Sequence, residues 1–219
     1  MEFTRSEENY LKAIYHLSQS NGSEISTNAI AEKLDTKPSS VTDMVQRLAD
    51  KKVLTYKKYK GAKLTEKGKQ LAVEIIRKHR LWETFLVEKL DFNWDEVHDI
   101  AEQLEHIRSE ELINRLDSFL EYPKTDPHGD PIPDKEGNFN KTQKKLLSQM
   151  KIGEEGICVG VKDSDTSFLQ YLNKKNIAIG TKISILARES FDNSLQIDVG
   201  GDKFFISKGV SENLYIKTS

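Results

Sequence analysis

The sequence predicts an α+β, multidomain protein: a winged helix-turn-helix, then a helical domain, then a small SH3-like β-barrel. Three observations predict this order. Apolar residues recur at helical spacing through most of the first 121 residues, a lysine-rich hairpin interrupts them near residue 60, and short β-favouring runs follow residue 152 at regular spacing. With 219 residues, the chain is long enough for two modest domains or three small ones.

The winged helix is predicted from four consecutive segments. Ser26 is placed to cap a short helix, TNAIAEKL, and Pro38 suits the first turn of the next helix, VTDMVQRLADK. VLTYKKYKGAKLT then reads as a hairpin around a lysine-rich turn, and Thr65 is placed to cap a long helix. The alternative is a small helical domain with a solvated basic loop.

Charge distribution supports a nucleic-acid partner for this first part. Residues 1–74 hold 13 Lys/Arg against 10 Asp/Glu, although the whole chain carries a net charge of -2. In a winged helix, the second helix enters the major groove and the hairpin lies along phosphates. The candidate DNA contacts are exposed polar and basic residues of these two elements: Lys37, Ser39, Ser40, Thr42, Arg47, Lys57, Lys58 and Lys60. For Ser39 and Ser40, capping of the helix is an equally good explanation.

The rest of the chain divides into a helical part and a β part. Residues from about 95 to 121 form one amphipathic pattern, which predicts a second helical stretch. DPHGDPIPDKEGNF contains three prolines and two glycines, which predicts a loop. The runs ICVGV, KISILARE, SLQIDVGG, KFFISKG and NLYIK predict the small β-barrel, with a helix at FLQYLNKKN.

Composition favours the cytoplasm. No apolar run approaches the roughly 20 residues that span a bilayer, and the charged N-terminus MEFTRSEENY lacks an apolar signal core. A single cysteine, Cys158, excludes an internal disulfide framework and cysteine-rich zinc sites.

Clustered imidazole and carboxylate groups predict a metal site. In HDIAEQLEH, the four groups His98, Glu102, Glu105 and His106 share about 100° of a helical arc, and the preceding helix places His79 and Glu83 one turn apart. Residues 90–107 contain no lysine or arginine. Nitrogen and oxygen ligands without thiolate suit Mn²⁺, Fe²⁺, Co²⁺ or Zn²⁺. The alternative is a solvated acidic face.

The proline-restricted loop adds Asp126 and His128, two residues apart in DPHG. These side chains could reach a metal held by His79 and Glu83. A purely turn-forming role of both residues beside proline is an equally good explanation.

The chain resembles the diphtheria-toxin-repressor (DtxR/MntR) family of metal-dependent transcriptional regulators. The resemblance covers nearly the whole chain and rests on ENYLKAIYHL, IAEKLDTKPSSVTDMVQRLADKKVL, LTEKGKQLA, RKHRLWETFL, VHDIAEQLEHI and HGDPIP in this order. It implies a DNA-binding domain over 1–74, a helical metal-binding and dimerisation domain over 75–145 with a loop at 122–140, and an SH3-like (FeoA-type) domain over 146–219. It also implies a cytoplasmic homodimer, not an enzyme, that binds palindromic operators on double-stranded DNA.

The resemblance also implies two metal ions per subunit, Mn²⁺ or Fe²⁺. One family site corresponds to Glu102, Glu105 and His106, with Asn9 at the position where relatives carry Met or Asp. The second corresponds to His79, Glu83 and His98, with Asp163 as the acidic group of the SH3-like domain and Asp126 and His128 from the loop. Glutamate at position 102, where iron-type members carry Cys, favours Mn²⁺.

The predicted mechanism is a metal-sensing repressor. Metal would bridge the helix at 98–106 to the helix carrying His79 and Glu83, and to the first helix through Asn9. The two winged helices of the dimer would then be held at the spacing of two half-sites. Two alternatives remain open at this point: a winged-helix regulator that senses an organic ligand, and a metallohydrolase, against which the basic hairpin and the absence of an HExxH signature argue.

Overall fold

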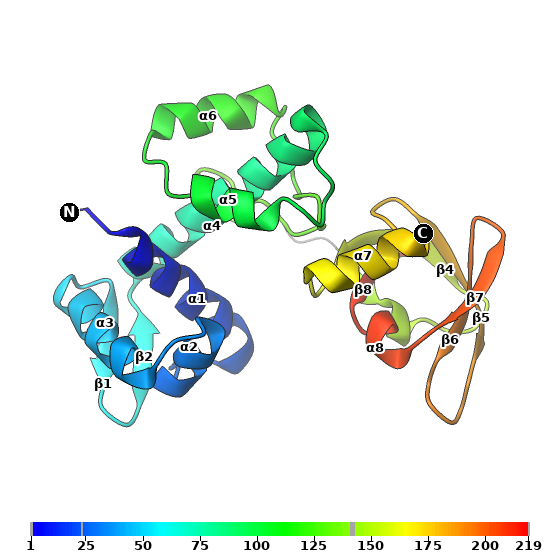
Figure 1. Ribbon diagram of the computed structural model, residues 1–219, viewed down its shortest axis with the longest axis horizontal. Coiled ribbons are helices and arrows are strands. Elements are labelled where there is room, and N and C mark those ends of the chain that lie inside the picture. Colours follow the sequence, from blue (N-terminus) through cyan, green and yellow to red (C-terminus); the bar gives the residue numbers. More distant parts are fainter. Residues whose placement is uncertain (1, 23, 141–142, 219) are drawn as a thin grey trace. The chain divides into compact units, whose positions relative to one another are not determined.

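The computed structural model describes residues 2–22, 24–140 and 143–218. The chain forms two compact units. Figure 1 labels their helices and strands. The first unit comprises Met1–His79, Glu102–Glu110 and Pro133–Phe139, and the second comprises Arg80–Ala101, Glu111–Ile132 and Asn140–Ser219.

Three helices and a hairpin form the N-terminal part of the first unit (Figure 1). They are α1 (Arg5–Asn21), α2 (Thr27–Lys33), α3 (Pro38–Asp50), β1 (Leu54–Lys57) and β2 (Gly61–Leu64). Ser26 caps α2 by accepting the Ala29 N–H, and Pro38 stands in the first turn of α3, as predicted. Fully buried side chains from every helix form one core: Leu11, Ile14, Ile30, Val41, Val45 and Leu48.

The hairpin is extended by a third segment. β1 and β2 pair antiparallel from Leu54 opposite Leu64, and Ile25 forms an isolated bridge with Ala62. Gly61 makes this close approach possible: its φ is +110°, and a Cβ there would lie 2.4 Å from the Ile25 carbonyl oxygen. The predicted winged helix is therefore present, with the lysine-rich turn between β1 and β2 as its wing.

Helix α4 (Glu66–Leu90) runs 25 residues and carries the chain from the first unit into the second. Beyond it, the prediction of one helical stretch from about 95 to 121 was wrong. Two helices are present, α5 (His98–Leu104) and α6 (Glu110–Phe119). The Ile107 N–H donates to the Leu104 carbonyl, three residues back instead of the four of an α-helix, and α5 ends here. Glu105 and His106 therefore lie in the turn after the helix. The segment 126–139 is a loop, as predicted.

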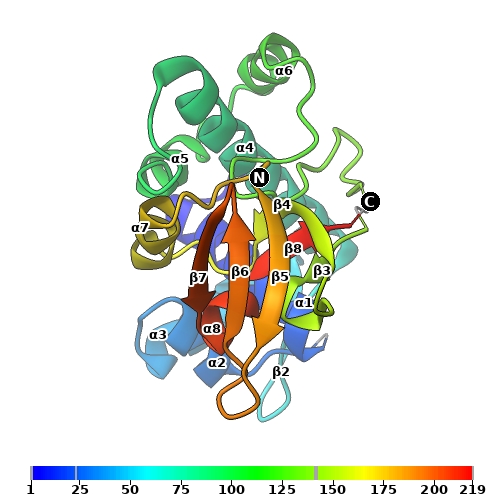
Figure 2. The same ribbon diagram turned by 90° about the vertical axis from the view of Figure 1, so that its right-hand side faces the viewer.

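The C-terminal part is a six-stranded antiparallel sheet in the order β3-β8-β4-β5-β6-β7, and Figure 2 shows β5, β6 and β7 side by side and facing the viewer. Its strands are β3 (Lys145–Leu146), β4 (Glu155–Val161), β5 (Lys182–Arg188), β6 (Leu195–Val199), β7 (Asp202–Ile206) and β8 (Leu214–Lys217). A 3₁₀ turn η1 (Leu147–Gln149) and helices α7 (Thr166–Lys174) and α8 (Lys208–Ser211) complete it. Strands β4–β8 coincide with the five predicted runs, and the two-residue β3 was not predicted. In the part of the chain that the structure describes, no helix is long and apolar enough to cross a membrane.

Gly61→Ala should destabilise the protein more than Gly22→Ala. Both glycines have positive φ, which costs an alanine about 1 kcal/mol. Only Gly61 would also place a Cβ against backbone, at 2.4 Å from the Ile25 oxygen, whereas Gly22 has nothing within 4 Å. We expect a further loss of about 1–3 kcal/mol in the free energy of unfolding for Gly61→Ala, measured by urea denaturation. Equal losses for the two variants would contradict the close approach of Ile25.

Candidate metal centre

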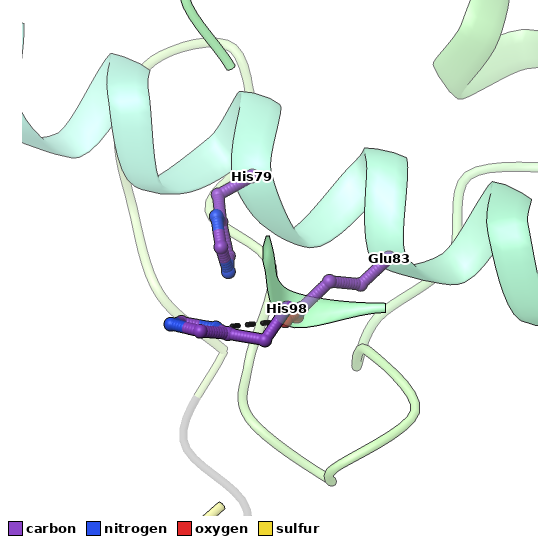
Figure 3. Close-up of side chains that lie close together, drawn as sticks. All are labelled: His79, Glu83 and His98. Atoms are coloured by element: carbon purple, nitrogen blue, oxygen red, sulfur yellow. Dashed lines mark ion pairs between the residues drawn. The ribbon is translucent and has the colours of Figure 1, made fainter. Parts of the chain in front are cut away.

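Helix α4 positions two of the predicted ligands. His79 and Glu83 stand one turn apart, and the boundary between the two units falls within this continuous helix, after His79. Figure 3 shows both side chains projecting from α4, with the Glu83–His98 ion pair dashed. Each of these three residues offers one ligand atom, and these atoms lie within 4.8 Å of one another.

Glu83 is the centre of a cluster within the second unit. Its carboxylate is 3.5 Å from His98 Nδ1 and 3.5 Å from His128 Nδ1, although only 3% of its side chain is exposed. Glu83, Asp126 and His128 also offer ligand atoms within 4.8 Å of one another, and all three are buried. We call Glu83, His98, Asp126 and His128, together with His79, the second centre.

Local hydrogen bonds hold the loop of the second centre in shape. Asp126 Oδ1 accepts the backbone N–H of His128 at 2.9 Å and of Asp130 at 3.0 Å. The His128 carbonyl accepts the Val161 N–H of β4 at 2.9 Å. Gly129 has a φ of +80°, and a Cβ there would lie 2.0 Å from the Val159 oxygen. The loop therefore packs directly on β4 through its backbone.

Two of these buried groups have shifted pKa values. Burial alone would lower the pKa of His128, but the hydrogen bond and negative charge of Glu83, together with Asp126, raise that pKa to about 9. Burial and the neighbouring charges of Glu83 and Asp130 raise the pKa of Asp126 to about 7. Because His128 Nε2 donates to the Trp94 carbonyl at 2.8 Å, Nδ1 is the atom left to face Glu83.

A separate set of charged groups gathers around Glu105 in the first unit. The Glu105 side chain is fully buried, and Lys12 Nζ lies 2.7 and 2.8 Å from its two oxygens. His79 Nδ1 is 2.6 Å from Glu105 Oε2, and Lys12 Nζ also reaches Glu102 at 3.1 Å. We call Glu102, Glu105 and His106, with Glu8 and Lys12 of α1, the first centre.

Helix α1 contributes to the first centre through residues that the sequence analysis did not single out. Glu8 Oε2 lies 2.5 Å from His106 Nδ1, and Lys12 pairs with both glutamates. Their spacing of four residues places Glu8 and Lys12 on one face of α1, which was the available signal. The family pattern drew attention to the neighbouring Asn9 instead.

Asn9 and Asp163 are placed differently from the other predicted ligands. Asn9 Oδ1 is buried and has no hydrogen-bond partner among the described residues, and Asn9 lines a cavity of about 590 Å³ together with Met44 and Arg47 of α3. Asp163 is exposed, its carboxylate accepts the Asp165 N–H, and neither ligand set of the second centre includes it. Ligation by either residue stays a prediction.

All eight predicted DNA contacts are exposed. Neither Ser39 nor Ser40 is the N-cap of α3; that position is Lys37, which makes no side-chain capping bond. The Thr42 hydroxyl donates to the Pro38 carbonyl at 3.0 Å. At the tip of the wing, Tyr59 is 94% exposed, and Lys58 Nζ lies 5.3 Å from the centre of its ring.

A winged helix joined to clustered imidazole and carboxylate groups defines a class: metal-responsive DNA-binding regulators. Comparisons with known families agree. Residues 2–62 match the iron dependent repressor N-terminal DNA binding domain, residues 65–134 its metal binding and dimerisation domain, and residues 145–218 the FeoA domain. The chain belongs to the iron-dependent repressor (DtxR/MntR) family, whose members are transcriptional regulators and not enzymes.

Individual relatives support this membership. The HTH-type transcriptional regulator MntR of Oceanobacillus iheyensis is 42% identical over 123 residues, which are 56% of this chain and 82% of that protein. The iron-dependent repressor IdeR of Mycobacterium tuberculosis is 38% identical over 132 residues, or 60% of this chain, and the match spans only 57% of IdeR.

Solved structures match over a greater length. A manganese-dependent transcriptional repressor in complex with manganese has a TM-score of 0.85 at 30% identity, covering 97% of this chain and 100% of that one. The manganese regulator SloR has a TM-score of 0.77 at 33% identity, covering 99% and 100%.

The residues present fit a divalent cation. The second centre offers only imidazole nitrogens and carboxylate oxygens, and burial together with the nearby charge of Glu83 raises the pKa of Asp126. The only cysteine, Cys158, is buried in the C-terminal sheet core and is not part of this set.

The metal-free protein should lose stability between about pH 6.5 and pH 9 through His128. The folded-state pKa of about 9 exceeds the ordinary value of 6.5, so the contribution of the imidazolium is complete below about pH 6.5 and disappears as the pH rises through about 9. In chelator, the difference in free energy of unfolding between the parent and His128→Gln should shrink over this range by up to about 3 kcal/mol. The exposed His16→Gln is the control. A difference independent of pH would contradict the raised pKa.

Proposed function

We propose that this protein is a DNA-binding transcriptional repressor that a divalent metal, Mn²⁺ or Fe²⁺, activates to control genes of metal-ion homeostasis. The observation that carries the proposal is the second centre: Glu83, Asp126 and His128 are all buried, and each offers a ligand atom within 4.8 Å of the other two. A winged helix in the same chain would bind the operator DNA.

Hydrogen bonds within the protein position two ligands of the second centre. The Trp94 carbonyl fixes the His128 ring, and the backbone of the 126–130 loop fixes the Asp126 carboxylate. A bound dication would supply the positive charge that the clustered carboxylates require and would favour loss of the His128 proton. His79 and His98 would complete the nitrogen ligands, with Asp163 as a further carboxylate from the segment after β4.

The choice of metal rests on ligand chemistry. Hard oxygens and imidazole without thiolate favour Mn²⁺, and also accept Fe²⁺. The similar structure that contains manganese supports the same choice. The first centre would hold the other of two ions per subunit through Glu102, Glu105 and His106, with Asn9 as a further ligand.

DNA recognition is proposed to use α3 and the wing. Lys37, Arg47 and the short hydroxyls of Ser39, Ser40 and Thr42 would meet the major groove, and the wing residues Lys57, Lys58 and Lys60 would lie along phosphates. Tyr59, exposed at the wing tip, is a further candidate for a contact to the sugar–phosphate backbone.

A palindromic operator would require a homodimer, because its two half-sites mirror the two-fold symmetry of the protein. We propose that this homodimer acts in the cytoplasm. Residues 65–134 match a dimerisation domain, and within this range the described part of the second unit exposes five large apolar side chains: Leu90, Phe92, Leu112, Phe119 and Tyr122. We infer that these side chains contribute to the dimer contact. We also propose the domain limits 1–74, 75–145 and 146–219, with the six-stranded sheet of the last domain curved into an SH3-like barrel.

Metal should control operator binding through Glu83. Glu83→Gln removes the carboxylate that His98 and His128 share, so metal affinity should fall by about 10–100-fold or more, and operator binding at low Mn²⁺ should fall with it. Fluorescence anisotropy on a selected operator, with and without Mn²⁺ or Fe²⁺, measures this. Glu88→Gln, an exposed position on the same helix, should behave like the parent. Equal operator affinity of the parent with and without metal would refute the proposal and favour a sensor of an organic ligand.

Wing lysines should contribute to the salt dependence of DNA binding. Removing one phosphate contact reduces the slope of log K against log salt by about 0.9, so Lys58→Ala should reduce the slope by about 2 in a dimer with two wings. Lys174→Ala, on α7, should leave the slope unchanged. Operator titrations at four salt concentrations measure both, and an unchanged slope for Lys58→Ala would exclude a phosphate contact at this position.

A further inference from the structure

The first centre already contains a cation. The Lys12 ammonium lies 2.7 and 2.8 Å from the two oxygens of Glu105 and 3.1 Å from Glu102 Oε1. Only 13% of the Lys12 side chain is exposed, and Glu105 is fully buried. Lysine is seldom this deeply buried unless it is paired, so the ammonium is held by the carboxylates around it.

These carboxylates are the same ones that a metal would use. Glu102, Glu105 and His106 are the proposed ligands of the first centre, and Lys12 makes direct contacts to two of them. Glu105 has its Oε1 on Lys12 and its Oε2 shared between Lys12 and His79. The remaining member, His106, has Nδ1 against Glu8. A dication therefore cannot bind both oxygens of Glu105 while the ammonium remains between them.

We propose that Lys12 is an internal counterion that occupies the first centre in the metal-free protein and that an incoming divalent cation must displace. This inference rests on the proposed function, since it concerns the metal of the first centre. Placing a dication beside an ammonium in a buried site would bring two positive charges together with little screening. Metal binding and the Lys12–Glu105 pair are therefore mutually exclusive.

Displacement would carry the metal signal into the DNA-binding domain. Lys12 belongs to α1, whose neighbouring residues Leu11 and Ile14 are fully buried in the core shared with α2 and α3. Two cations then compete for one carboxylate, one from α1 and one from solution. Without metal, the Lys12–Glu105 ion pair holds α1 against Glu105. In the metal-loaded state, Glu105 coordinates the metal and this ion pair is absent.

Lysine acetylation followed by peptide mass spectrometry tests the displacement on the unmodified sequence. Without metal, Lys12 should react slowly with an acetylating reagent because its ammonium is bound and mostly buried. Saturating Mn²⁺ should raise the acetylation rate of Lys12 severalfold. Lys51 is the internal control: its Nζ lies 2.7 Å from the mostly buried Glu7 of α1, outside the first centre, so its rate should not change.

Two results of this experiment have distinct meanings. Stoichiometric Mn²⁺ binding with an unchanged acetylation rate at Lys12 overturns the counterion proposal and leaves the proposed function intact. The absence of Mn²⁺ binding in equilibrium dialysis overturns the proposed function and the counterion proposal with it.

Substitution provides a second, independent measurement. Lys12→Met removes the competing charge and keeps much of the side-chain volume, so Mn²⁺ should bind the first centre about tenfold more tightly or better. Lys12→Arg retains the charge and should keep the parent affinity. Lys51→Met removes the comparable ion pair to Glu7 and controls for general loss of stability. Calorimetric titration in which Lys12→Met binds Mn²⁺ no more tightly than Lys51→Met would overturn the proposal.

Discussion

Two buried carboxylates, Glu83 and Glu105, require positive charge or hydrogen-bond donors beside them, and the surrounding residues provide these. An isolated carboxylate is costly to remove from water, and it persists in its ionised form only beside positive charge or hydrogen-bond donors. Glu105 has Lys12 and His79 as its partners, and Glu83 faces His98 and His128. Helix α4 carries His79 and Glu83 one turn apart, so a single helix contributes to both sets.

The two centres meet this requirement in different ways. The first has a full ammonium at hydrogen-bond distance. The second has imidazoles, whose charge depends on pH; against the lowering effect of burial, the hydrogen bond and negative charge of Glu83 raise the pKa of His128 to about 9. A dication satisfies the second centre without displacing a lysine. We therefore expect the second centre to fill first and the first centre to respond at higher metal concentration.

Much of the fold could be predicted because local patterns agree with it. The apolar stripe of α3, the lysine-rich turn and the five β runs each identify an element from its own residues. The break between α5 and α6 could not be predicted, since Leu104 and Ile107 keep the apolar spacing of a helix across the position where α5 ends. Lys12 and Glu8 were missed for a related reason: their spacing marks one face of α1, but the residues that this face contacts lie nearly a hundred positions away in the sequence.

Divalent metal is expected to compensate the buried carboxylates of α4 and of the turn after α5. The most direct measurement is the free energy of unfolding in chelator and in saturating Mn²⁺, for the parent and for the double variant Glu83→Gln/Glu105→Gln. The parent should gain stability with Mn²⁺, and the double variant should gain almost none. Equal stabilisation of both proteins by Mn²⁺ would contradict this expectation, because the metal would then act elsewhere.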